Sequence, residues 1–133
     1  TYYVQALTWT PDVTIASFIC GLLIDTLLVV NNYRDREADA RSGKRTVIVR
    51  FGEKFGRYFY LLLGISASLL CLYFLREGHI YAALLPQLYL VPHVLTWRRM
   101  VKIHSGKKLN SILGETSRNM LFMGILLAIG MIL

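Results

Sequence analysis

The sequence predicts an all-α fold, a multi-span transmembrane helix bundle with about four spans plus the end of a fifth. Of the 133 residues, 55% are hydrophobic and only 17% are charged, whereas soluble domains carry about 25% charged residues. The charges are also segregated, because 58–75 and 78–97 contain no charged residue. Each of these stretches is about as long as a helix needs to be to cross a hydrocarbon core of roughly 30 Å.

We place the spans near 13–33, 58–75, 79–97 and 117–133, within one transmembrane domain over 1–133. Only Asp25 interrupts the first span, and Pro86 and Pro92 predict a kink in the third. Residues 1–9 are rich in Tyr, Val, Leu and Trp, which predicts the end of a preceding helix. His79, His93 and His104 lack the spacing of metal ligands, so we expect them at an interface or in a loop.

The cations predict which ends of the spans share one side of the membrane. The two polar loops are expected at 34–57 and 98–116. From 31 to 57 there are eight Lys or Arg against four acids, and from 98 to 118 there are six against Glu115 alone. Two spans separate these basic segments, so both lie on one side, which the positive-inside tendency makes cytoplasmic. We therefore expect a multi-pass protein of the inner or plasma membrane, with its polar chemistry on the cytoplasmic side.

The net charge of +7 does not predict a nucleic-acid partner. A nucleic-acid module presents its cations on a soluble basic face, whereas these cations border membrane spans. For the segment 98–108, topology and contact with anionic lipid headgroups explain the charge. The expected partner of the chain as a whole is the lipid bilayer.

Two carboxylates stand at the end of the first span. Asp35 and Asp39 are four residues apart, which places them on one face of a helix with Cβ atoms roughly 6 Å apart. Asn31 precedes Asp35 by four residues and Asn32 precedes it by three, so both amides can join the same face. Carboxylate oxygens at this spacing suit Mg²⁺, which takes one or two carboxylates and fills its other positions with water and phosphate.

Cations follow these carboxylates directly. We expect the helix to break near Gly43, after which Lys44 and Arg45 supply a point charge and a bidentate fork for phosphate. A metal on one side and cations on the other would stabilise a departing diphosphate. A nucleotide-binding P-loop is excluded, because Ala38 and Arg45 stand where that motif needs Gly and Ser or Thr.

Other interpretations of the segment stay open at this point. A juxtamembrane helix can carry the same acids paired with arginines or facing water. A transporter or channel would also show spans and an intramembrane acid, and a structural membrane subunit needs no charged site. Asp25 is a candidate proton acceptor, a partner for a cation on another helix, or a structural hydrogen-bonding group.

The segment 31–52 reads Asn-Asn-x-Arg-Asp-x-x-x-Asp-x-x-x-Gly-Lys-Arg-Thr-x-x-Val-Arg-x-Gly. It resembles the second aspartate-rich motif of the UbiA-type intramembrane prenyltransferases. The turn from Gly43 to Thr46 is similar to that of the branch acting on 1,4-dihydroxy-2-naphthoate, rather than the 4-hydroxybenzoate branch with its Gly-x-Lys-Ser turn. Further likeness lies in the segment 1–5 and in Leu109, Asn110, Thr116 and Arg118.

This resemblance implies a nine-helix bundle, of which the chain covers the end of the fifth helix through the ninth. It implies that Asp35 and Asp39 bind Mg²⁺ carrying a polyprenyl diphosphate, with Lys44 and Arg45 on the diphosphate. It also implies a first aspartate-rich motif on N-terminal helices, of which we find no copy here. The implied activity is transfer of the polyprenyl group to 1,4-dihydroxy-2-naphthoate, with loss of carbon dioxide, to give demethylmenaquinone. The acceptor can also be another aromatic compound.

Overall fold

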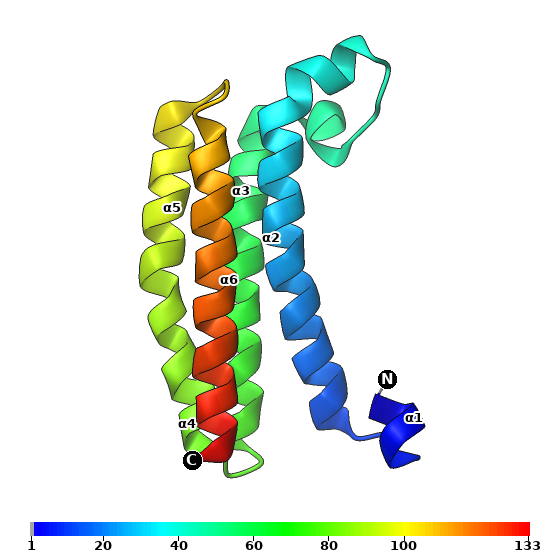
Figure 1. Ribbon diagram of the computed structural model, residues 1–133, viewed down its shortest axis with the longest axis vertical. Helices are drawn as coiled ribbons and strands as arrows, with labels where there is room; N and C mark the ends of the chain where they lie inside the picture. Colours follow the sequence, from blue (N-terminus) through cyan, green and yellow to red (C-terminus); the bar gives the residue numbers. More distant parts are fainter. Residues whose placement is uncertain (1) are drawn as a thin grey trace.

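The computed structural model describes residues 2–133, with side chains from Val4 onward, so Thr1 of the segment 1–5 lies outside the described residues. Every regular element in this range is helical, which confirms the predicted all-α class. Columns of helix run side by side along the molecule (Figure 1). They are formed by α2, α3, α6 and the broken column of α4, η2 and α5, and a short helix α1 (Tyr2–Ala6) precedes α2.

Helix α2 (Pro11–Arg41) is a single helix of 31 residues. Pro11 lies in its first turn, where a missing N–H costs nothing. Between Pro11 and Gly43 the sequence contains no further proline and only one glycine, Gly21. The helix therefore continues from its apolar part into the charged residues that follow. Residues 34–41, within the expected cytoplasmic segment 34–57, are the last two turns of α2, in agreement with the predicted helix break near Gly43.

Helix α3 (Val47–Leu70) begins directly after a short turn. Thr46 caps it, because its hydroxyl accepts a hydrogen bond from the Val49 N–H at 3.3 Å. Gly52, with φ +87° and ψ 172°, interrupts the helical backbone and sets residues 47–51 at an angle to the long part. The column then ends in a 3₁₀ helix, η1 (Cys71–Leu75). The polar connection between α2 and α3 is thus reduced to residues 42–46.

The third column is divided where the sequence predicted a kink. It consists of α4 (Ile80–Leu84), the 3₁₀ helix η2 (Leu85–Tyr89), which contains Pro86, and α5 (Leu90–Ile103). Because of this division the expected span 79–97 is not one long helix. Within residues 2–133, three helices are long and apolar enough to cross a membrane, namely Pro11–Arg41, Val47–Leu75 and α6 (Leu109–Ile132). Helix α6 begins well before the expected start at 117.

The columns pack around buried aromatic and polar side chains. Tyr60 and Tyr89 are fully buried, and the His93 ring stacks between them with centroid distances of 4.7 and 5.0 Å. The His93 Nδ1 lies 3.0 Å from the Tyr89 hydroxyl. The expectation that His93 lies at an interface or in a loop is therefore wrong. Near the same level the buried Glu115 pairs with Arg99 at 2.6 Å.

Gly130 of α6 tests how tightly these columns pack. A Cβ atom on Gly130 would lie 2.6 Å from backbone atoms of Ala82 in α4. Backbone atoms, unlike a side chain, have no other rotamer that would relieve the clash. We therefore expect Gly130→Ala to force α4 and α6 apart and to lower the free energy of unfolding by about 1–3 kcal/mol. Gly124→Ala on the same helix is the matched control, since nothing lies within 4 Å of its Cβ. Equal thermal stability of the two variants in detergent would contradict the packing described.

Candidate functional site

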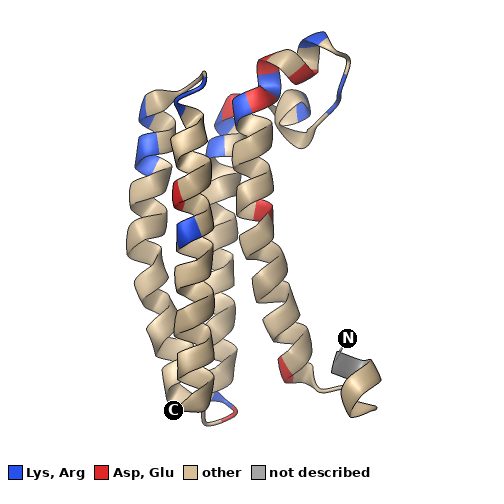
Figure 2. Cartoon of the chain, in the orientation of Figure 1, with Lys and Arg blue, Asp and Glu red and all other residues tan. Residues whose placement is uncertain are grey.

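Most of the charged side chains gather at one end of the bundle, where α2 ends, α3 begins and α5 turns into α6 (Figure 2). The opposite end carries few charges, among them Arg76 and Glu77 in the turn after η1. Both predicted carboxylates, Asp35 and Asp39, belong to the charged end. The segment singled out in the sequence therefore lies in the most polar region of the described chain.

Arg34 organises the first predicted carboxylate. Its Nε donates to Asp35 Oδ1 at 2.7 Å and its Nη2 donates to Asp35 Oδ2 at 2.6 Å, a bidentate arrangement. The same guanidinium donates to Asn31 Oδ1 at 2.8 Å and to Asn110 Oδ1, on α6, at 3.0 Å. The structure thus brings Asn31 and Asp35 together as predicted, around an arginine whose role the sequence did not reveal.

Asp35 opens onto a cleft of about 580 Å³ between the end of α2 and the α5–α6 turn. Three cations line it, Arg34, Arg41 and Lys107, together with the Asn110 amide and the acids Asp35 and Glu37. A cleft with this lining can receive an anion of several charges, because guanidinium and ammonium groups form charge-assisted hydrogen bonds with phosphate oxygens. It is large enough for a diphosphate group.

Asp39 and Lys44 form a second pair. Asp39 is 8% exposed, and the Lys44 Nζ lies 3.4 Å from its Oδ1. The turn after α2 produces this contact, because the Lys44 N–H donates to the Asp39 carbonyl at 2.9 Å and Gly43 takes φ +77°. Since φ in this range favours glycine, the sequence correctly places the helix end. Arg45 is exposed in the same turn.

The predicted residues do not all face one cavity. Asn31 and Asp35 surround Arg34 at the cleft, and Asp39 is not among the residues that line it. Asn32 lines a different, smaller pocket, deeper along α2, together with Asp25. Of the four predicted amides and acids on α2, Asp35 lines the cleft and Asn32 lines the smaller pocket, while Asn31 and Asp39 line neither.

The donor chemistry fits one side of a magnesium site. Carboxylate and amide oxygens, as supplied by Asp35, Asp39 and Asn31, are the ligands that Mg²⁺ prefers. Within residues 2–133 the structure contains no group of three or more His, Cys, Asp or Glu that could hold a metal ion. Each of the two carboxylates is instead paired with a cation of the chain.

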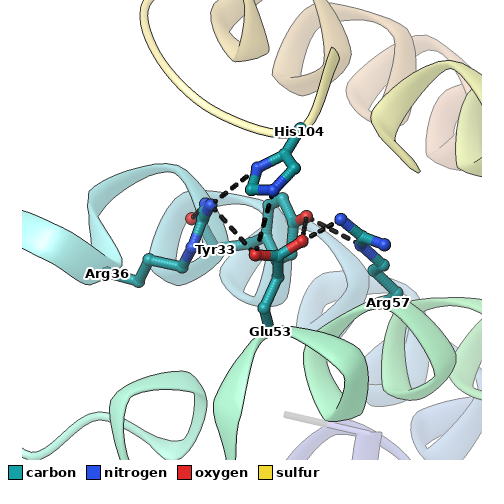
Figure 3. Close-up of polar contacts among 5 residues, drawn as sticks. All are labelled: Tyr33, Arg36, Glu53, Arg57 and His104. Atoms are coloured by element: carbon teal, nitrogen blue, oxygen red, sulfur yellow. Dashed lines mark hydrogen bonds and ion pairs between the residues drawn. The ribbon is translucent and has the colours of Figure 1, made fainter. Parts of the chain in front are cut away.

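Sequence reasoning missed a polar cluster centred on Glu53 (Figure 3). Its carboxylate pairs with Arg57, lies 3.4 Å from both Arg36 Nη2 and His104 Nε2, and accepts a hydrogen bond from the Tyr33 hydroxyl at 3.0 Å. Arg36 also donates to the Tyr33 carbonyl at 2.7 Å and covers the Tyr33 ring at 4.5 Å. The Glu53 cluster thus joins α2, α3 and the end of α5. The one signal of this cluster in the sequence is the four-residue spacing of Glu53 and Arg57, which is typical of an ion pair on a helix.

Comparison with known proteins agrees with this architecture. The model of the UbiA prenyltransferase family matches residues 1–124. Two curated relatives are each named 1,4-dihydroxy-2-naphthoate octaprenyltransferase, one from Escherichia coli (strain K12) and one from Haemophilus influenzae (strain ATCC 51907 / DSM 11121 / KW20 / Rd). They are 39% and 38% identical over 71 residues. Each match covers 53% of this chain and 23% of the relative. No solved structure matches.

The apolar helices and the charged helix end define a multi-pass membrane protein. The chain belongs to the UbiA prenyltransferase family, since the family model covers nearly its whole length.

Proposed function

We propose that the protein transfers a polyprenyl group from polyprenyl diphosphate to 1,4-dihydroxy-2-naphthoate, with loss of carbon dioxide. The observation that carries this proposal is the end of an apolar helix where Asp35 faces a cation-lined cleft and Asp39, one turn further on, pairs with Lys44. Family membership supports prenyl transfer, and the printed names of the two relatives support the naphthoate acceptor. We place the active site on the cytoplasmic side of the inner or plasma membrane, on the basis of the distribution of cations alone.

In this proposal the chain's own residues bind and position the diphosphate. Asp35 and Asp39 would hold Mg²⁺, with the Asn31 amide held beside Asp35 by Arg34, and a bound Mg²⁺ would neutralise charge on the leaving diphosphate. Lys44 and Arg45 would contact the diphosphate oxygens. Arg34 and Lys107, which line the cleft, add positive charge where the leaving group develops negative charge. The first aspartate-rich motif, on helices outside this chain, would supply the other ligands.

The reaction is an electrophilic aromatic substitution. The bond between the first isoprenoid carbon and the diphosphate oxygen breaks, and its electron pair leaves with the diphosphate. The electron-rich ring then attacks the allylic cation, and the ring carboxylate departs as carbon dioxide. The apolar helix faces keep water from the cation, while the tail stays in the hydrocarbon region. A different hydroxylated aromatic acid is the second candidate acceptor, because the matched segment covers only part of each relative.

The full-length protein in lipid nanodiscs tests this proposal. With polyprenyl diphosphate, Mg²⁺ and 1,4-dihydroxy-2-naphthoate, we expect demethylmenaquinone in its quinol form, with one diphosphate and one carbon dioxide for each transfer. Chelation of divalent cations is expected to stop the reaction, and added Mg²⁺ to restore it. The products are measured by mass spectrometry and carbon dioxide release. Undiminished transfer in chelator would contradict the metal assignment, and preference for 4-hydroxybenzoate would contradict the acceptor.

A further inference from the structure

A second concavity lies deeper along α2 than the cation-lined cleft. It encloses about 190 Å³ between α2 and the beginning of α3. Two polar side chains, Asp25 and Asn32, line it, and the ring of Phe59 lies in its wall. The remaining lining is aliphatic and comes from Leu28, Val29, Val47 and Ile48. An apolar pocket with a few convergent polar groups is the usual form of a small-molecule site.

Both polar groups of this pocket are free to bind a ligand. Within residues 2–133, neither Asp25 nor Asn32 forms an ion pair or a side-chain hydrogen bond. Asp25 is nevertheless exposed in the middle of an apolar stretch. A carboxylate at membrane depth is costly unless a polar group or a water-filled cavity covers it. The Asp25 carboxylate therefore needs a partner that donates a hydrogen bond or carries positive charge, and a ligand in the pocket can supply it.

The pocket is also aligned with the proposed reaction site. Seven residues separate Asp25 from Asn32, about 10 Å along a helix, and Asn32 precedes Asp35 by less than one turn. A ligand that extends from Asp25 to Asn32 thus ends beside the carboxylate that faces the cation-lined cleft. A cavity of about 150 Å³ in another protein holds benzene, so this pocket of about 190 Å³ has room for one aromatic ring, with the rest of a larger acceptor at its open side. The Phe59 ring offers a stacking partner.

We propose that this pocket is the binding site of the aromatic acceptor, in which the Asp25 carboxylate accepts a hydrogen bond from a ring hydroxyl and Phe59 packs on the ring. This inference deepens the proposed function and rests on it for the class of ligand. The hydrogen bond to a carboxylate increases electron density in the ring, which favours attack on a cation. The Asn32 amide holds the other end of the acceptor, next to the site where the diphosphate leaves.

The test uses the full-length protein in nanodiscs, with Asp25→Asn as the main variant. We expect the KM for 1,4-dihydroxy-2-naphthoate to rise about tenfold or more, because a hydrogen bond to a charged group is replaced by a neutral one, while the KM for polyprenyl diphosphate changes less than about twofold. Asp12→Asn, the same substitution on the same helix outside the pocket, is the matched control and leaves both KM values unchanged. Val47→Phe fills the pocket and is expected to raise the acceptor KM while Asp25 stays in place.

Equilibrium binding of the acceptor without diphosphate separates this inference from the proposed function. If the wild-type protein binds dihydroxynaphthoate and Asp25→Asn weakens binding, the pocket assignment stands even where no transfer is found. If transfer occurs but neither Asp25→Asn nor Val47→Phe changes acceptor KM or binding, the assignment is overturned. Loss of folded protein in Asp25→Asn, with Val47→Phe normal in binding, would overturn it too, by showing that Asp25 pairs with a cation on another helix.

Discussion

Replacing Asp35 or Asp39 by asparagine in the full-length protein is expected to lower the rate of prenyl transfer at least about a hundredfold, the size of loss that follows removal of a key electrostatic group. Asparagine keeps the size of the side chain and an oxygen that can accept from Arg34 or Lys44. The fold is therefore expected to survive. The loss falls on the rate, because each carboxylate is proposed to hold Mg²⁺ at the leaving diphosphate.

The measurement is kcat as a function of Mg²⁺ concentration, with folded yield from size-exclusion chromatography. We expect both variants to need more Mg²⁺ for half-maximal rate, and Glu77→Gln to behave as the wild type. Glu77 is an exposed acid in the turn at the opposite end of the bundle. A wild-type rate in Asp35→Asn and Asp39→Asn would refute the proposed metal site.

Replacing Glu53 by alanine is expected to have the second-largest effect, this time on stability. Glu53 is the only acid of the Glu53 cluster, which holds Arg36, Arg57 and His104 around it. Its removal leaves two guanidinium groups close together without their shared counter-charge. Breaking a buried ion pair costs about 3–5 kcal/mol. Because the Glu53 side chain is 26% exposed, we expect a loss of about 2–3 kcal/mol.

Chemical unfolding in mild detergent measures this loss. Lys54→Ala is the matched control, since Lys54 is the exposed neighbour of Glu53 on the same helix, and it is expected to change stability by less than about 0.5 kcal/mol. A double-mutant cycle with His104→Ala shows whether the end of α5 is coupled to α3 through Glu53. If Glu53→Ala and Lys54→Ala unfold alike, the Glu53 cluster does not hold these elements together.

The sequence predicted those features that depend on neighbours along the chain. The uncharged stretches predict apolar helices, and the four-residue spacing of Asp35 and Asp39 predicts two carboxylates on one face at the end of a helix. Gly43 marks the end of α2 because a left-handed backbone conformation there favours glycine. The proline at 86 gives the break in the third column. In each case the cause lies within a few residues of its effect.

Features that depend on contacts between distant segments were not predictable in this way. Asn110 meets Arg34 across 76 residues, and His104 meets Arg36 across 68. His93 looked like a loop or interface residue because its burial depends on Tyr60 from another helix.

The unbroken course of α2 has a consequence for how the membrane acts on the charged end. A helix of 31 residues is about 46 Å long, well beyond a hydrocarbon core of roughly 30 Å. The apolar and charged parts therefore move as one rod, without a hinge to separate them. When a bilayer is thinner or thicker than the apolar part, such a helix changes its tilt. Asp35 would then shift relative to Asn110 on α6, so bilayer thickness becomes a physical variable that sets the width of the cleft.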